Sequence, residues 1–219
     1  MSLHHDVHKI AQNGPGGPQR GHNGKGVDTM ALPAENKRYT FADVLTWDEK
    51  DRIEIINGEA FMMAPPSRIH QEISGELFGQ LRDYLKGKKC KVYHAPFGVR
   101  LFEEDGDYPE DVDTMVEPDI SVVCDPGKLD DRGCKGAPDL IIEILSRSTQ
   151  RHDRLTKFNL YQRAGVQEYW IVDPDSKSVQ TFTLEKGYYI AKDFGAASDK
   201  VMVGVLEECV IDLSTVFSE

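Results

Sequence analysis

Hydrophobic positions along the chain switch between strand-like and helix-like spacing, which predicts a domain built from both elements. Continuous apolar runs rich in β-branched residues predict buried strands at 118–124, 139–145 and 168–172. Apolar residues at helical spacing predict helices at 41–47, 67–85 and 148–164. Shorter apolar runs predict further strands at 92–94, 99–102, 179–184, 188–191 and 201–205, and a strand or helical turn at 211–217. This order is typical of the α/β (α+β) class, with a mixed sheet flanked by helices.

Turn residues divide these elements. Asn57-Gly58 lies between two apolar runs and predicts a β-hairpin over 52–64. Gly165 predicts the end of the 148–164 helix, after which the chain returns as a strand. The strands on either side of this helix are therefore expected to be parallel neighbours. The segments 103–113, which is acidic, and 125–136 are expected to be loops.

The first 35 residues differ from the rest in composition. They contain many Gly, His, Asn and Pro and have no apolar period, which indicates a disordered or tag-like tail at 1–35. The remaining chain, 36–219, is long enough for one domain with its own core.

Charge and cysteine content narrow the function classes. The formal net charge of −11 argues against a protein that coats nucleic acid, although a local basic patch is compatible with it. Four scattered cysteines without CxxC spacing favour a reducing compartment over a zinc site or a disulfide framework. No apolar run has the length of a membrane span, and no signal peptide core is visible at the N-terminus. We therefore expect a cytoplasmic protein without a membrane partner.

Two buried strands each carry a carboxylate in an otherwise apolar run. Asp119 opens the first of these strands and Glu143 lies within Ile-Ile-Glu-Ile-Leu in the second. A carboxylate in a buried strand is costly unless it is paired or binds a metal. If the strands are neighbours, Asp119 and Glu143 converge, and two carboxylates with few other ligands suit Mg²⁺ or Mn²⁺. A metal-bound water of lowered pKa is a nucleophile for a phosphodiester.

The helix that follows supplies positive charge. Residues 147–163 contain five Lys or Arg and one acid, Asp153. Lys157 lies at the edge of an expected buried stripe formed by Leu155, Phe158 and Tyr161, where its ammonium can extend toward the sheet end. We predict that Lys157 stabilises the developing charge of the reaction. The predicted contacts to the phosphate backbone are Arg147, Arg151 and Arg154.

These motifs together resemble the bacterial Uma-two family of restriction-type endonucleases, within the PD-(D/E)XK nuclease superfamily. The resemblance covers about Tyr39 to Phe217 and rests on Pro118-Asp119, on Glu143-Ile144-Leu145-Ser146, on Asp153 to Lys157 with Tyr161, and on the run from Gly165 to Pro174. The Asn57-Gly58-Glu59 hairpin and the helix start at Ser67 to His70 also match.

The resemblance implies a restriction-endonuclease-like fold and Mg²⁺-dependent cleavage of DNA without a small-molecule cofactor. It assigns Asp119 and Glu143 to the motif acids, and it implies that the lysine lies on the following helix, at Lys157, because Leu145 occupies the usual lysine position. It also implies that Glu59 is an upstream acid and that His70 is a base or a phosphate contact. Enzymes of this type commonly pair to cut two strands, so a homodimer is expected.

The sequence also allows two alternatives to a DNA endonuclease. A catalytically degenerate binding or regulatory protein on the same fold agrees with the negative charge and with Leu145 in the lysine position. A nuclease for RNA or structured DNA is the other, since the sequence has no groove-reading helix or single-strand stacking motif that decides between them.

Overall fold

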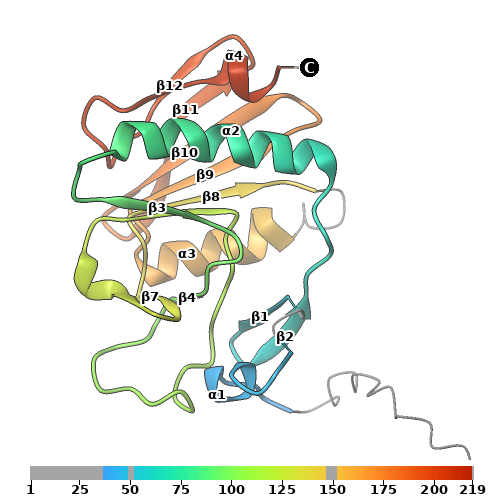
Figure 1. The fold of residues 1–219 in the computed structure, drawn as a ribbon, viewed down its shortest axis with the longest axis vertical. Helices are drawn as coiled ribbons and strands as arrows, with labels where there is room; N and C mark the ends of the chain where they lie inside the picture. The colour runs from blue at the N-terminus through green and yellow to red at the C-terminus, as the bar shows by residue number, and fades with distance from the viewer. Residues whose placement is uncertain (1–36, 49–51, 147–151, 219) are drawn as a thin grey trace, which may run out of the picture. The chain divides into compact units, whose positions relative to one another are not determined.

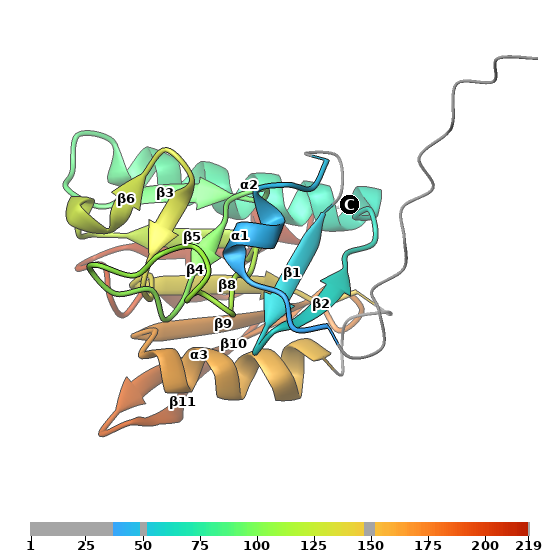
Figure 2. The same ribbon diagram turned by 90° about the horizontal axis from the view of Figure 1, so that it is seen from below.

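The structure is a computed structural model that describes residues 37–48, 52–146 and 152–218. The predicted tail at 1–35 lies outside these residues, so the proposed domain boundary stays a prediction. Figures 1 and 2 show the ribbon in two views. The helices are α1 (Phe41–Val44), α2 (Arg68–Leu85), α3 (Phe158–Ala164) and α4 (Leu213–Val216), with a 3-10 turn at Pro126–Lys128 and a π-helical segment at His152–Lys157.

The strands form one large sheet and three small ones. The central sheet has the order β11-β10-β9-β8-β5-β3 and comprises β3 (Lys91–His94), β5 (Ile120–Val123), β8 (Leu140–Ile144), β9 (Glu168–Asp173), β10 (Ser178–Glu185) and β11 (Tyr188–Ala196). The small sheets pair β1 (Ile53–Ile56) with β2 (Glu59–Met62), β12 (Lys200–Met202) with β13 (Val210–Asp212), and β4 (Val99–Arg100) with β7 (Gly133–Lys135) and β6 (Leu129–Asp130). The central sheet is mixed, because β8 and β9 are parallel and the other pairs are antiparallel. The predicted mixed sheet and parallel pair are confirmed.

Helices cover both faces of the central sheet, as the ribbon shows (Figure 1). One face packs against α2 through Ile73, Leu77, Leu81 and Leu85, together with residues of β12, β13 and α4. The other face packs against Leu160 and Tyr161 of α3 and against residues of the β1–β2 and β4–β7–β6 sheets. Alternation along β8 sends Ile142 to the α2 face and Ile141 to the α3 face, so the strand is buried on both sides.

Turn geometry follows the sequence signals closely. Asn57 and Gly58 both have positive φ, 49° and 81°, which is the backbone that a two-residue hairpin loop needs. Gly165 has a φ of 88° and ends α3, with its N–H bonded to the carbonyls of Tyr161 and Gln162. Ser67 caps α2 by accepting a hydrogen bond from the N–H of His70. Asn57 and Gly58 therefore fix the hairpin turn, Gly165 fixes the end of α3, and Ser67 fixes the start of α2.

Some local predictions were wrong. The expected loop at 125–136 contains the 3-10 turn and two short strands, β6 and β7. These two strands pair with each other, and β7 also pairs in parallel with β4. Cys90 and Cys124 form a disulfide, contrary to the expectation of free thiols. The register of β3 and β5 pairs Lys91 with Val123, so the next residues, Cys90 and Cys124, stand opposite each other although 34 positions separate them. Within the described residues no helix is long and apolar enough to cross a bilayer. The cytoplasmic location stays a prediction.

Candidate functional site

A cavity of about 800 Å³ lies where the β1–β2 hairpin, the first turn of α2 and the ends of β5 and β8 meet. Its ionisable lining residues are Arg52, Glu54, His70, Asp119, Glu143, Lys157 and Asp175. Its apolar wall includes Phe61, Met62, Met63 and Ile69, and Ile69 is half exposed rather than part of the buried stripe of α2. Polar groups that converge beside an apolar wall are typical of ligand sites.

Asp119 lies at the start of β5, opposite Glu143. The antiparallel pairing of Ile120 with Ile142 places these two acids at the next position of the register. The Oδ2 atom of Asp119 accepts hydrogen bonds from the N–H of Ile144, at 2.8 Å, and from Nε2 of His70, at 3.1 Å. Within the described residues, both hydrogen bonds of the Asp119 carboxylate go to Oδ2, which leaves Oδ1 available to a ligand.

His70 is held by its place in the first turn of α2. Burial disfavours the imidazolium, but the hydrogen bond and charge of Asp119 outweigh burial and raise the pKa of His70 above its ordinary value. His70 was predicted to lie near the site, and its Nε2 atom contacts the Asp119 carboxylate. His70 therefore fixes the orientation of the Asp119 carboxylate, as partners of metal-binding carboxylates do.

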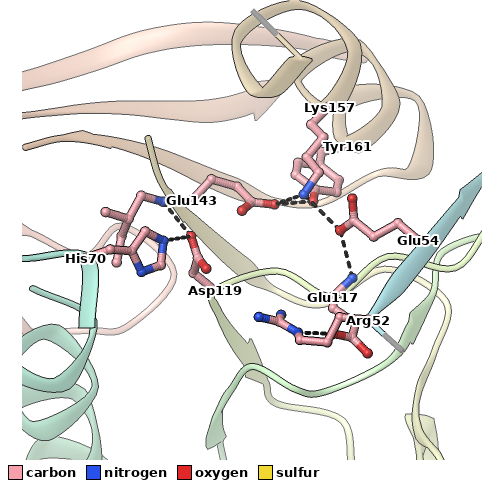
Figure 3. A network of polar contacts seen from close by, with 9 residues as sticks. Arg52, Glu54, His70, Glu117, Asp119, Glu143, Lys157 and Tyr161 are labelled. Atoms are coloured by element: carbon pink, nitrogen blue, oxygen red, sulfur yellow. Dashed lines mark hydrogen bonds and ion pairs between the residues drawn. The ribbon is translucent and has the colours of Figure 1, made fainter. Parts of the chain in front are cut away.

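Glu143 and Lys157 form a buried group with Glu54 (Figure 3). The Nζ atom of Lys157 donates to Oε1 of Glu143 and to Oε1 of Glu54, both at 2.9 Å. The hydroxyl of Tyr161 donates to the same Oε1 of Glu143, at 2.6 Å. Burial, with the charges of Glu143 and Glu54, holds the pKa of Tyr161 well above its ordinary value, so the hydroxyl keeps its proton. Glu54, Glu143 and Lys157 are each only 3% exposed, so each charge depends on its partners.

The π-helical segment sets the position of Lys157. A π-helix has a wider turn than an α-helix, so it shifts the faces of the residues that precede α3. Lys157, at its last position, points inward, whereas Leu155 is 58% exposed and was wrongly predicted to lie in the buried stripe. Segments of this kind occur frequently at functional sites.

Glu54, and not Glu59, is the hairpin acid that joins the group. Both residues point to the same side of the hairpin, because Glu59 pairs with Ile56, two residues after Glu54. Glu59 lies beside the turn, is exposed and does not line the cavity, so the structure does not bring it together with the other predicted site residues. The missed signal is the one used for Glu143, since Glu54 also stands inside an apolar strand, Ile53-Glu54-Ile55-Ile56.

The lining of the cavity fits a divalent cation. Four carboxylates line it, from Glu54, Asp119, Glu143 and Asp175, against two permanent cations, Arg52 and Lys157. Within residues 37–48, 52–146 and 152–218, no three His, Cys, Asp or Glu side chains gather closely enough to form a closed metal site. Mg²⁺ does not need such a cage, because it retains several waters and is commonly held by one or two carboxylates plus substrate phosphate. The pair Asp119 and Glu143 meets that requirement.

The predicted arginine contacts are not described by the structure. Arg147 and Arg151 lie outside the described residues, and Arg154 falls in the π-helical segment without a described side chain. Their contact with a phosphate backbone stays a prediction. Leu145, in the usual lysine position, packs in the core on the α3 side.

The chain is similar to a protein family and to two cyanobacterial proteins. A family model described as "Uma2: Putative restriction endonuclease" matches residues 41–214. The uncharacterized protein slr1290 of Synechocystis is 27% identical over 143 residues, which cover 64% of this chain and 71% of that protein. The uncharacterized protein sll1609 of the same organism is 25% identical over 149 residues, covering 66% of this chain and 80% of that protein.

A solved structure shares the fold. It is a crystal structure from Anabaena variabilis, described as "a putative nuclease belonging to DUF820", and it superposes with a TM-score of 0.63 at 21% sequence identity. The match covers 82% of this chain and 98% of that one. This likeness confirms the predicted fold class.

Proposed function

Because the chain belongs to the Uma2 family, described as "Putative restriction endonuclease", we propose that it is a Mg²⁺- or Mn²⁺-dependent endonuclease that hydrolyses phosphodiester bonds of DNA. The observation that carries the proposal is the placement of Asp119 opposite Glu143 at a cavity that Lys157 also lines. A cation bound there would supply a water of lowered pKa as nucleophile and would neutralise phosphate charge.

The protein side chains have separate roles in this proposal. Asp119 and Glu143 hold the cation, and His70 keeps Asp119 in one orientation through the contact at 3.1 Å. Lys157 places a positive charge beside Glu143, where it stabilises the negative charge that develops on the phosphoryl oxygens. Glu54 and Tyr161 position this pair, since Glu54 accepts from the ammonium and Tyr161 donates to Glu143. A fixed ammonium needs little reorganisation during the reaction.

DNA and a second copy of the chain are the proposed partners. Cleavage of both strands of a duplex requires two cuts, which a homodimer delivers from two sites. Light scattering with and without DNA tests the assembly, and a strict monomer in both conditions would contradict it. If the protein cleaves RNA and not DNA in parallel assays, RNA would replace DNA as the proposed substrate.

One observation favours the degenerate binding protein as a second candidate. Glu143 already has a cationic partner in Lys157, and that ion pair competes with a metal ion for the carboxylate. Calorimetric titration with Mn²⁺ separates the two candidates. The endonuclease requires Mn²⁺ binding that Asp119→Asn and Glu143→Gln abolish, whereas the degenerate binding protein does not require it.

Nicking of a supercoiled plasmid tests the proposed activity. Wild-type protein with Mg²⁺ or Mn²⁺ is expected to relax and linearise the plasmid, and Asp119→Asn and Glu143→Gln are expected to be inactive. Glu59→Gln is the control, because it removes an exposed carboxylate of the neighbouring β1–β2 hairpin that does not line the cavity. Equal nicking by wild type and both site variants would attribute the signal to a contaminant and refute the proposal.

A further inference from the structure

Two buried polar side-chain atoms at the candidate site have no hydrogen-bond partner among the described residues. Among the described residues, the buried side-chain nitrogen and oxygen atoms without a hydrogen-bond partner belong to Arg52, His70, Arg100 and Ser121. Arg52 and His70 both line the cavity that contains Asp119 and Glu143, whereas Arg100 and Ser121 do not. A buried donor without a partner costs roughly 1–3 kcal/mol, so it is commonly explained by a ligand, an ion or a water.

Arg52 makes little use of its donors. Its Nε atom donates to Oε2 of Glu117 at 3.1 Å, and its Nη2 atom is buried without a partner. A guanidinium has five N–H donors in a planar fork, so among the described residues this contact leaves most of its donors without a protein partner. The side chain is 28% exposed, which places it at the wall of the cavity rather than inside the core.

The hairpin fixes where this guanidinium lies. Arg52 directly precedes β1, and its carbonyl accepts a hydrogen bond from the N–H of Met63 beyond β2. Figure 3 shows the guanidinium below Asp119, whereas Lys157 approaches Glu143 from above. Two cations therefore flank the carboxylate pair from different elements.

We propose that Arg52 forms a phosphate-binding site at the wall of the cavity and holds a nonbridging oxygen of the nucleic-acid backbone. The fork of a guanidinium matches the oxygens of a phosphodiester, and charge-assisted hydrogen bonds of this kind are the strong ones. The cavity lining is otherwise net negative, so this cation lowers the repulsion that a phosphate meets on entry. The inference rests on the proposed nuclease function, to which it adds a substrate contact outside the carboxylate and lysine group.

Binding of a labelled DNA in EDTA tests this site without metal or hydrolysis. Fluorescence anisotropy is expected to show that Arg52→Met weakens binding by about 10- to 100-fold and that Arg52→Lys falls between it and wild type. The slope of log affinity against log salt should decrease in magnitude by about 1 in Arg52→Met. Arg82→Met is the matched control, because Arg82 is exposed, pairs with Asp83 and lies outside the cavity.

Glu117→Gln distinguishes a phosphate contact from a structural ion pair. If Arg52 binds phosphate, removing the Glu117 charge leaves DNA affinity unchanged or increases it, because the carboxylate no longer competes for the guanidinium. If Arg52 only braces the hairpin, Glu117→Gln weakens binding as much as Arg52→Met does, and both variants unfold at a lower temperature. That second pattern would overturn the proposal, as would equal affinities of Arg52→Met and Arg82→Met or no DNA binding by wild type.

Cleavage kinetics separate this inference from the nuclease proposal. Wild type that binds DNA through Arg52 but never nicks it would refute the nuclease and leave the phosphate site standing. Nicking that depends on Asp119, together with unchanged KM, kcat and DNA affinity in Arg52→Met, would refute the phosphate site alone.

Discussion

Replacing Lys157 by Met removes the cation that lies between two buried carboxylates. Glu54 and Glu143 would then face each other across the position of the lost ammonium, and each is almost fully buried. Breaking a buried ion pair by removing one partner typically costs about 3–5 kcal/mol. Each 1 kcal/mol shifts Tm by roughly 2–4 °C in a domain of this size, so we expect Lys157→Met to lower Tm by about 6–20 °C.

Thermal unfolding followed by circular dichroism measures this change. Lys157→Met combined with Glu54→Gln should recover part of the lost stability, because the second substitution removes one of the two buried carboxylate charges that have lost their cation. A Tm shift below about 2 °C in the single variant would refute the reasoning. Even about 1 kcal/mol of destabilisation would produce a shift of about 2 °C or more. The variant should also lose cleavage while retaining Mn²⁺ binding, since Asp119 and Glu143 remain in place.

Two further predictions concern contacts at the site, and a third concerns the disulfide. Tyr161→Phe removes the hydrogen bond to Glu143 and should lower the free energy of unfolding in urea by about 1–3 kcal/mol, whereas unchanged stability would contradict the contact at 2.6 Å. Glu54→Gln should slow plasmid nicking by about 100-fold because Lys157 loses its position, and Glu59→Gln should leave the rate unchanged; the reverse order would restore Glu59 as the site residue. Reduction of the disulfide between Cys90 and Cys124, which closes a loop of 34 residues, should lower stability by about 4 kcal/mol, and a double Ala variant of these cysteines should not respond to reductant.

The sequence was sufficient to predict the features that follow from local rules. Asn57-Gly58 predicted the hairpin and Gly165 predicted the end of α3, because both positions need positive φ. The strand that contains Glu143 was predicted because its apolar run is continuous. Two-residue periodicity then predicted which side chains share a face, and the observed register brings Asp119 opposite Glu143.

The remaining features depend on tertiary pairing. Glu54 stands in an apolar strand, as Glu143 does, but only the fold brings its carboxylate within 2.9 Å of the Nζ atom of Lys157. The outward position of Leu155 depends on a π-helical segment, whose wider turn the apolar spacing does not reveal. The disulfide depends on the register of β3 against β5, which spans 34 residues of sequence.

The central claim is that Asp119 and Glu143 bind one divalent cation beside Lys157. Anomalous diffraction from a crystal soaked in Mn²⁺ tests it most directly. We predict one strong peak within coordination distance of both carboxylates, about 2.0–2.2 Å from their oxygens, which disappears in Asp119→Asn. A wild-type crystal without a peak there, or with Mn²⁺ at carboxylates outside the cavity, would contradict the account.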